Sequence, residues 1–321
     1  MKNNNIRKII HRNNIKEITI ITGQQKSGKS LITKLVSTLK GPINIKIDFG
    51  LDNIVQLIKN KFINISQFRD IFLLILDNIF ISSTLGRNLN LKKNEESSIW
   101  STSNPQFYLK KIKSKIGKKN LKHLVKKENA LFITLHNFIE FKNILSKNIS
   151  KINIIYVYTN PINQVLNLFN SKKFTTAGEK IDRSVLYLFK NKKIFNDVCG
   201  YEKKYLKYSR LGKILLLKNI YDKSDLNSLK KKEGNIKVLK LDYNNFLHNP
   251  NTESAKISKF LNKKMSNITK KFLSSKELKS RRNNISINNV IKNKKLLKSK
   301  IKNKKELLLF KKILNNYKKF K

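Results

Sequence analysis

The chain of 321 residues carries a formal net charge of +50, from 70 Lys and Arg against 20 Asp and Glu. Its length suits one large α/β domain with an appended segment better than two equal domains. The positive charge favours anionic ligands through long-range attraction. The excess is spread through a chain crowded with Lys, Asn and Ile, as an AT-rich genome would produce, and no nucleic-acid-binding module is recognisable. A specific nucleic-acid partner is therefore not expected.

The single cysteine, Cys199, excludes an intrachain disulfide and fits a reducing compartment. The first residues lack a long apolar core and a small-residue cleavage site, so no secretory signal is expected. The most apolar window, residues 71–81, is too short to span a membrane and is interrupted by Asp77 and Asn78. We therefore expect a cytoplasmic protein without a transmembrane segment.

The first predicted elements are a strand over residues 18–22, a glycine-bounded loop and a helix over residues 31–39. This order directs backbone N–H groups and a helix N-terminus at one anion. Gly23 allows a sharp turn, and Gly28 lets the main chain approach a phosphate without an intervening Cβ. Charge and hydroxyl donors come from Lys26, Ser27, Lys29 and Ser30. The loop also satisfies G-x-x-x-x-G-K-[ST], the nucleoside-triphosphate pattern, and so predicts phosphate binding.

Short apolar runs alternate with helical patterns along the rest of the chain. Further strands are predicted over residues 43–47, 130–135, 152–158 and 236–241, with helices over 51–59, 68–81 and 161–169. Nearly continuous β-branched runs are typical of parallel strands buried on both faces. We therefore expect a three-layer, P-loop-NTPase-like α/β fold with a mainly parallel central sheet. In such sheets ligands bind at the carboxyl ends of the strands.

Two stretches depart from this alternation. Residues from about 86 to 127 are polar and lysine-rich, which indicates an insertion that we expect to lie over the site. Residues 295–314 predict a basic amphipathic helix or a pair of helices. We accordingly divide the chain into an α/β domain, 1–285, and a basic helical C-terminal extension, 286–321. Packing of the Leu/Ile stripe on the parent domain is favoured over weak contact with an anionic membrane surface.

Three blocks carry a family resemblance. They are Lys26-Ser-Gly28 in the loop, Phe132-Ile-Thr-Leu-His136 followed by residues 154–167, and Val238-to-Pro250 followed by residues 257–261. Together they resemble the sulfotransferases that use phosphoadenosine phosphosulfate (PAPS). In that family the first block cradles the 5′-phosphosulfate, and the second supplies the catalytic histidine and the 3′-phosphate site. The third resembles the late strand, the Tyr-Glu-Asp-Leu and Asn-Pro motifs and the Phe-Leu helix.

The resemblance implies roles for individual residues. His136 would be the catalytic base, and its intrinsic pKa of about 6.5 suits that role. Lys26 would neutralise charge on the bridging oxygen. The 5′-phosphate would be held by Gly23, Lys26, Ser27, Gly28, Lys29 and Ser30. His11, His123 and His248 lie in polar stretches and are expected at the surface, and no spacing of His, Cys and carboxylates indicates a structural metal.

The sequence departs from the family at the 3′-phosphate site. The family's arginine aligns with Thr159 and its serine with Asn167, and neither residue supplies a cation. Arg281 and Arg282 fall where the family's C-terminal basic loop reaches the 3′-phosphate. Lys172 and Lys173 are further candidates for that role.

The function implied is transfer of a sulfuryl group from PAPS, leaving 3′,5′-phosphoadenosine, to a hydroxyl of a carbohydrate, lipid or tyrosyl acceptor. The positive charge hints that the acceptor, a small molecule or a glycan, is anionic. No metal is required. One alternative is a small-molecule kinase that uses ATP and magnesium, with Ser30 and Asp48 near the metal. The other is a non-catalytic binding protein on the same scaffold.

Overall fold

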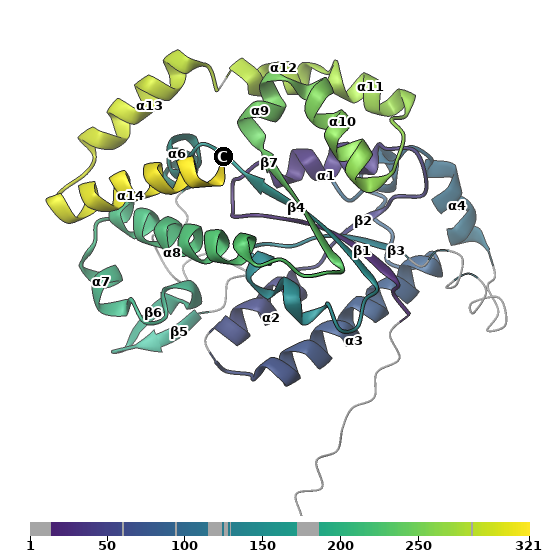
Figure 1. The fold of residues 1–321 in the computed structure, drawn as a ribbon, viewed down its shortest axis with the longest axis horizontal. Coiled ribbons are helices and arrows are strands. Elements are labelled where there is room, and N and C mark those ends of the chain that lie inside the picture. Colours follow the sequence, from purple (N-terminus) through teal and green to yellow (C-terminus); the bar gives the residue numbers. More distant parts are fainter. Residues whose placement is uncertain are drawn as a thin grey trace, which may run out of the picture.

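The computed structural model describes residues 14–59, 61–93, 95–114, 124, 128, 130–171, 186–283 and 285–321. Its centre is a five-stranded sheet in the order β2-β3-β1-β4-β7, with every neighbouring pair parallel (Figure 1). The strands are β1 (Glu17–Thr22), β2 (Ile45–Ile47), β3 (Ala130–Thr134), β4 (Lys151–Tyr158) and β7 (Ile236–Asp242). The prediction of an α/β fold with a mainly parallel central sheet is confirmed.

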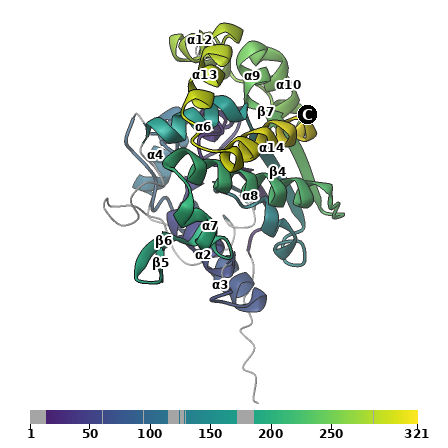
Figure 2. The same ribbon diagram turned by 90° about the vertical axis from the view of Figure 1, so that its left-hand side faces the viewer.

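Helices cover both faces of this sheet, which explains why its strands are nearly continuous apolar runs. On β4, Ile154 and Tyr156 face the core shared with α2 (Phe49–Lys59) and α3 (Ile65–Thr84). The alternate residues Ile155 and Val157 face the core shared with α1, α9 and α10. These helices span Lys29–Ser37, Tyr243–His248 and Pro250–Leu261. The three layers are visible in Figures 1 and 2.

A third core joins the C-terminal helices to the rest of the fold. Residues 287–320 form the two helices α13 (Ile287–Ser299) and α14 (Lys304–Phe320). α14 lies along α8 (Arg210–Lys230), and its Phe310 and Ile313 are buried in a cluster with residues of α8 and α6 (Pro161–Asn170). The apolar stripe of α14 thus packs within the protein, as its 3.6-residue periodicity allows.

The remaining described elements are peripheral. They are α4 (Pro105–Lys113), β5 (Leu186–Phe189), β6 (Lys192–Phe195), α7 (Glu202–Lys207), α11 (Asn267–Leu273), α12 (Lys276–Asn283) and 3₁₀ turns at Ile99–Ser101, Ile139–Ile144 and Asn196–Val198. The β5–β6 hairpin was not predicted. Helix α3 begins three residues before its predicted start, because Asn64 and Gln67 form a reciprocal capping box. In the described part of the chain, no helix has the length and apolar character needed to cross a membrane.

The described part of segment 86–127 does not lie over the loop, contrary to expectation. Ser97 accepts a hydrogen bond from Asn44 at the start of β2, and the Ser101 carbonyl accepts one from Ser37 at the end of α1. Ser103 donates to the carbonyl of Gly41. These contacts hold the segment against the C-terminal end of α1, whereas the glycine-bounded loop lies at its N-terminal end.

Candidate functional site

The loop between β1 and α1 has an unusual backbone. Gly23, Lys26 and Gly28 have φ angles of 146°, 58° and 96°. A Cβ on Gly23 would lie 2.1 Å from the carbonyl oxygen of Val157 on β4, so only glycine fits there. Lys26 is exposed and adopts the left-handed region, which costs an L-residue about 1–2 kcal/mol. Backbone strain of this kind concentrates at functional sites.

Position 28 must be glycine because another side chain packs against its backbone, a contact that the sequence did not predict. A Cβ there would lie 2.2 Å from the ring of Tyr243, the first residue of α9. The ring therefore packs directly on the backbone at the start of α1. Burial raises the pKa of the Tyr243 phenol, while the guanidinium of Arg281 beside it acts in the opposite direction.

Unsatisfied donors gather at the N-terminus of α1. Among the described residues, the backbone N–H groups of Gly28 and Ser30 donate no hydrogen bond. The Ser27 hydroxyl is buried and has no partner in the described part of the chain. A buried unsatisfied hydroxyl costs about 1–3 kcal/mol, and an anion at the positive end of the helix dipole would accept from all three groups. The arrangement fits a phosphate or sulfate group.

Lys29 has a different position from the one its place in the pattern suggests. Its side chain is buried, and Nζ donates to the carbonyls of Gly23 and Gln24, both at 2.8 Å. The ammonium thus satisfies two carbonyl oxygens inside the loop. Ser30, the next residue, is exposed.

A buried polar network, which the sequence did not predict, joins the loop to α8. Gln24 Nε2 donates to Asp222 and Asp225 of α8, at 2.9 Å each. The Tyr156 hydroxyl donates to Asp225 at 2.7 Å, and Lys218 pairs with Asp222. Burial raises the pKa of Asp225 to about 6. Two aspartates three residues apart, with Lys218 one turn before Asp222, were the available sequence signal.

His136 follows β3, next to the loop. The N–H of the adjacent Asn137 donates to the Gly23 carbonyl at 3.3 Å. Asp52 of α2 accepts from the His136 backbone N–H at 2.8 Å and lies 2.7 Å from Nδ1. Because a carboxylate only accepts, Nδ1 carries a proton. In the neutral imidazole the basic lone pair is therefore on Nε2. The His136 side chain is 34% exposed, so the ring is oriented yet reachable. No pattern in the sequence pointed to Asp52.

The predicted 3′-phosphate residues, Thr159 just after β4 and Asn167 on α6, are not arranged as an anion site. Thr159 is buried, and its hydroxyl donates to Asn244 Oδ1 at 2.7 Å. Asn160 instead caps α6 by accepting from the N–H of Ile162 at 2.9 Å. Asn167 is exposed on the same helix. Both candidate side chains are neutral, and that of Thr159 is already engaged within the protein.

The two arginines of α12 have separate environments. Arg281 donates to Glu277 at 3.1 Å and is hydrogen-bonded to Tyr243, the residue whose ring covers Gly28. Arg282 Nε donates to the Leu247 carbonyl at 2.7 Å, near the end of α9. Arg281 is thus connected to the loop through one aromatic ring, whereas Arg282 stabilises α9. Lys172, Lys173, His11 and His123 lie outside the described residues.

Asp48 has the structural role of a helix cap. Its carboxylate accepts from the backbone N–H of Leu51 at 3.0 Å. The strand beside β1 ends in Thr134, whose hydroxyl is 2.8 Å from that of Thr33. Within the described ranges, no three or more His, Cys, Asp and Glu residues gather as a metal-binding group.

No family model and no curated protein matches the sequence. Among solved structures, the chain is similar to the sulfotransferase domain from the Synechococcus PCC 7002 olefin synthase. That similarity has a TM-score of 0.41 and 12% identity over 85% of this chain and 82% of the other. A sulfotransferase domain from the curacin biosynthetic pathway gives a TM-score of 0.38 and 11% identity over 86% of this chain and 82% of that domain. Similarities this distant assign no function to the chain.

Proposed function

We propose that the protein transfers a sulfuryl group from PAPS to a hydroxyl acceptor. The observation that carries this proposal is the pairing of His136 with Asp52, directly beside an anion-binding loop. The hydrogen bond from Asn137 to Gly23 fixes the base relative to that loop. An oriented base next to an anion site is the minimum that transfer to a hydroxyl requires.

The residues at the loop fit the phosphosulfate end of the donor. The unpartnered Ser27 hydroxyl and the N–H groups of Gly28 and Ser30 would hold its oxygens. The 3′-phosphate end has no cation at Thr159 or Asn167. Arg281 is the described cation linked to the loop through Tyr243, and we assign 3′-phosphate recognition to it.

When bound, PAPS would supply the electrophilic sulfuryl group. His136 Nε2 would take the proton of the acceptor hydroxyl, and Asp52 would stabilise the imidazolium that results. Such a general base contributes about 10²–10⁴-fold to turnover. The Lys26 ammonium would neutralise charge that develops on the leaving phosphate. Ammonium and N–H groups supply the positive charge, so the proposal needs no metal. Carbohydrate, lipid and tyrosyl hydroxyls remain the acceptor classes, with an anionic acceptor favoured by the charge of the chain.

A thermal-shift titration tests the donor class directly. Purified protein would be titrated with 3′,5′-phosphoadenosine, ADP and ATP, each with and without magnesium. A ligand at a hundredfold its Kd stabilises the fold by about 2.7 kcal/mol. We expect magnesium-independent stabilisation by 3′,5′-phosphoadenosine. Stabilisation by ATP only in the presence of magnesium would overturn the proposal.

The same titration separates the kinase alternative, and an added assay of transfer from PAPS separates the non-catalytic one. A kinase is favoured by the match of Gly23 to Ser30 with the triphosphate pattern, but Asp48 caps α2 and β3 is followed by His136. A non-catalytic binding protein is favoured by the internal bond of Thr159. Binding of 3′,5′-phosphoadenosine without transfer from PAPS to any hydroxyl acceptor would support that alternative.

A further inference from the structure

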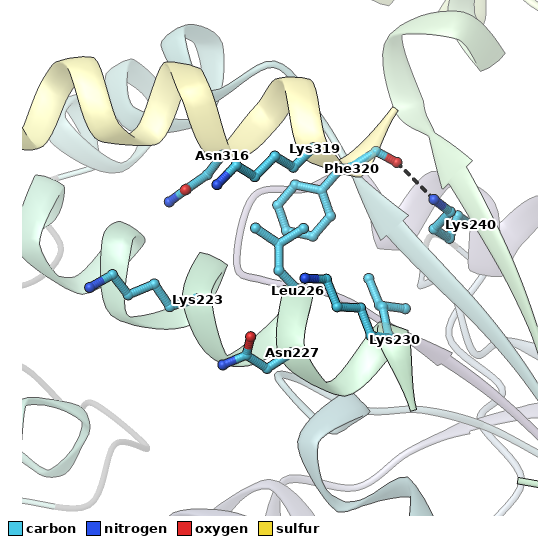
Figure 3. Close-up of a pocket in the computed structure, with 9 residues that line it drawn as sticks. Lys223, Leu226, Asn227, Lys230, Lys240, Asn316, Lys319 and Phe320 are labelled. Carbon is cyan, nitrogen blue, oxygen red and sulfur yellow. Dashed lines mark hydrogen bonds between the residues drawn. The ribbon is translucent and has the colours of Figure 1, made fainter. Parts of the chain in front are cut away.

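A basic pocket lies away from the loop, between α8, β7 and the last turn of α14 (Figure 3). Its volume is about 690 Å³, which is within the range of small-molecule sites. Four lysines contributed by the three elements line it: Lys223, Lys230, Lys240 and Lys319. Figure 3 shows them around the opening, with Asn227 and Asn316 between them.

The pocket has a local excess of positive charge. No carboxylate is among its lining residues. The aspartates of α8, Asp222 and Asp225, are buried and committed to Gln24, Tyr156 and Lys218. Lys240 donates to the Phe320 carbonyl at 3.1 Å, so one ammonium is fixed at the rim. Ammonium groups that converge on a cavity without a counter-ion repel one another, and a multiply charged anion would relieve that repulsion.

The floor of the pocket is apolar, which distinguishes it from a lysine-rich surface. The apolar lining residues are Leu226, Leu229 and Phe320; Phe320 is buried and the leucines are half-buried, whereas the four lysines are exposed. The Phe320 ring is held rigidly, because it stacks on Tyr156 and Tyr158 with ring centroids 5.8 and 5.5 Å apart. A charged rim around an apolar floor is complementary to a carbon skeleton that bears charged groups, rather than to a bare inorganic ion.

The pocket is separate from the loop. Phe320 also lines a second, smaller cavity, together with Gln24, Ser27 and Thr159. Among the described residues, Phe320 alone lines both cavities, so the basic pocket is otherwise built from different side chains. We propose that the basic pocket is a second ligand site, which binds an organic anion bearing two or more phosphate or sulfate groups. The proposal does not depend on the proposed function.

Isothermal titration at fixed ionic strength tests the site on the full chain. Inositol hexakisphosphate and sucrose octasulfate are the phosphate and sulfate probes, and inorganic tripolyphosphate is the probe without a carbon skeleton. We expect one equivalent of at least one organic probe to bind. The variant Lys223→Gln/Lys230→Gln/Lys319→Gln should bind it about tenfold more weakly, as three partly exposed ion pairs imply. Tripolyphosphate bound as tightly as the organic probes would overturn the assigned role of the floor.

The matched control removes three exposed lysines elsewhere, as Lys259→Gln/Lys264→Gln/Lys270→Gln on α10, α11 and the connection between them. It changes the net charge equally and should leave affinity unchanged. Equal weakening in both variants would show diffuse attraction only and overturn the proposal. In Gly28→Ala, which should no longer bind 3′,5′-phosphoadenosine at the loop, the probe should bind the pocket with unchanged affinity, and a loss of probe affinity would contradict a separate site. If that nucleotide does not bind at all, the proposed function fails while the pocket remains testable.

Discussion

The two halves of the candidate site differ in how their polar groups are used. At the ends of β1 and β3, Ser27 has an unpartnered hydroxyl and His136 is held by a dedicated carboxylate. At the end of β4, Thr159 donates to Asn244 and Asn167 is neutral. The first half combines backbone N–H groups with side chains, whereas side chains alone would have to build the second. Because backbone donors do not depend on side-chain identity, we expect the proposed anion binding at the loop to tolerate sequence drift better than the proposed recognition of the 3′-phosphate.

The largest effect is expected at Gly28, where the first half depends on close packing. Gly28→Ala places a Cβ 2.2 Å from the Tyr243 ring at a φ of 96°, so ligand stabilisation in the thermal-shift assay should be abolished. Gly200→Ala is the control, because its φ is 79° with nothing within 4 Å of the added atom. Gly200→Ala should lower the free energy of unfolding by about 1 kcal/mol and leave ligand stabilisation unchanged. If Tyr243→Ala fails to restore binding to Gly28→Ala, the clash is not the cause.

The next largest effect is expected at the base. His136→Ala should lower turnover about a hundredfold or more and leave nucleotide affinity nearly unchanged. Asp52→Asn should also lower turnover and shift the pH profile of kcat, because the carboxylate no longer stabilises the imidazolium. Steady-state kinetics across pH measure both effects. Unchanged turnover in His136→Ala would remove the base from the mechanism.

The second half of the site should show smaller effects. Arg281→Ala should reduce the preference for 3′,5′-phosphoadenosine over ADP by about tenfold, the loss of one charge-assisted contact. Arg282→Ala is the matched control and should lower the melting temperature without changing this preference, since Arg282 holds the Leu247 carbonyl. If wild type and Arg281→Ala prefer 3′,5′-phosphoadenosine over ADP equally, Arg281 does not supply the cation that Thr159 and Asn167 lack.

The smallest effect concerns the network behind the loop. Burial raises the pKa of Asp225 from its usual value of 3.8 to about 6, so between these pH values the folded protein binds the proton more tightly than the unfolded chain. The contribution of Asp225 to the free energy of unfolding is therefore present below about pH 4 and falls as pH rises to about 6. Asp225→Asn should remove this slope in denaturant titrations. If the free energy of unfolding of Asp225→Asn depends on pH as in the wild type, other carboxyl groups cause that dependence.

The sequence by itself determined the local architecture. The β-branched runs and the spacing of Gly23 and Gly28 predicted β1, the loop and α1, and the other central strands were located to within about two residues. The parallel sheet followed from the alternation of strands and helices, which placed the loop, His136 and Thr159 at one edge. These features depend on periodicity and turn chemistry within short windows, so they are readable without the fold.

Only the tertiary structure decided which side chains meet. Asp52 pairs with His136 across 84 residues, and Gln24 bonds to Asp225 across 201. The Tyr243 ring covers Gly28, and the Thr159 hydroxyl donates a hydrogen bond to Asn244. Such contacts follow from the way helices pack on the sheet, and no local pattern in the chain specifies them. The loop and the absence of a cation at Thr159 and Asn167 were therefore predictable, whereas the pairing of His136 with Asp52 and the internal hydrogen bond of Thr159 were not.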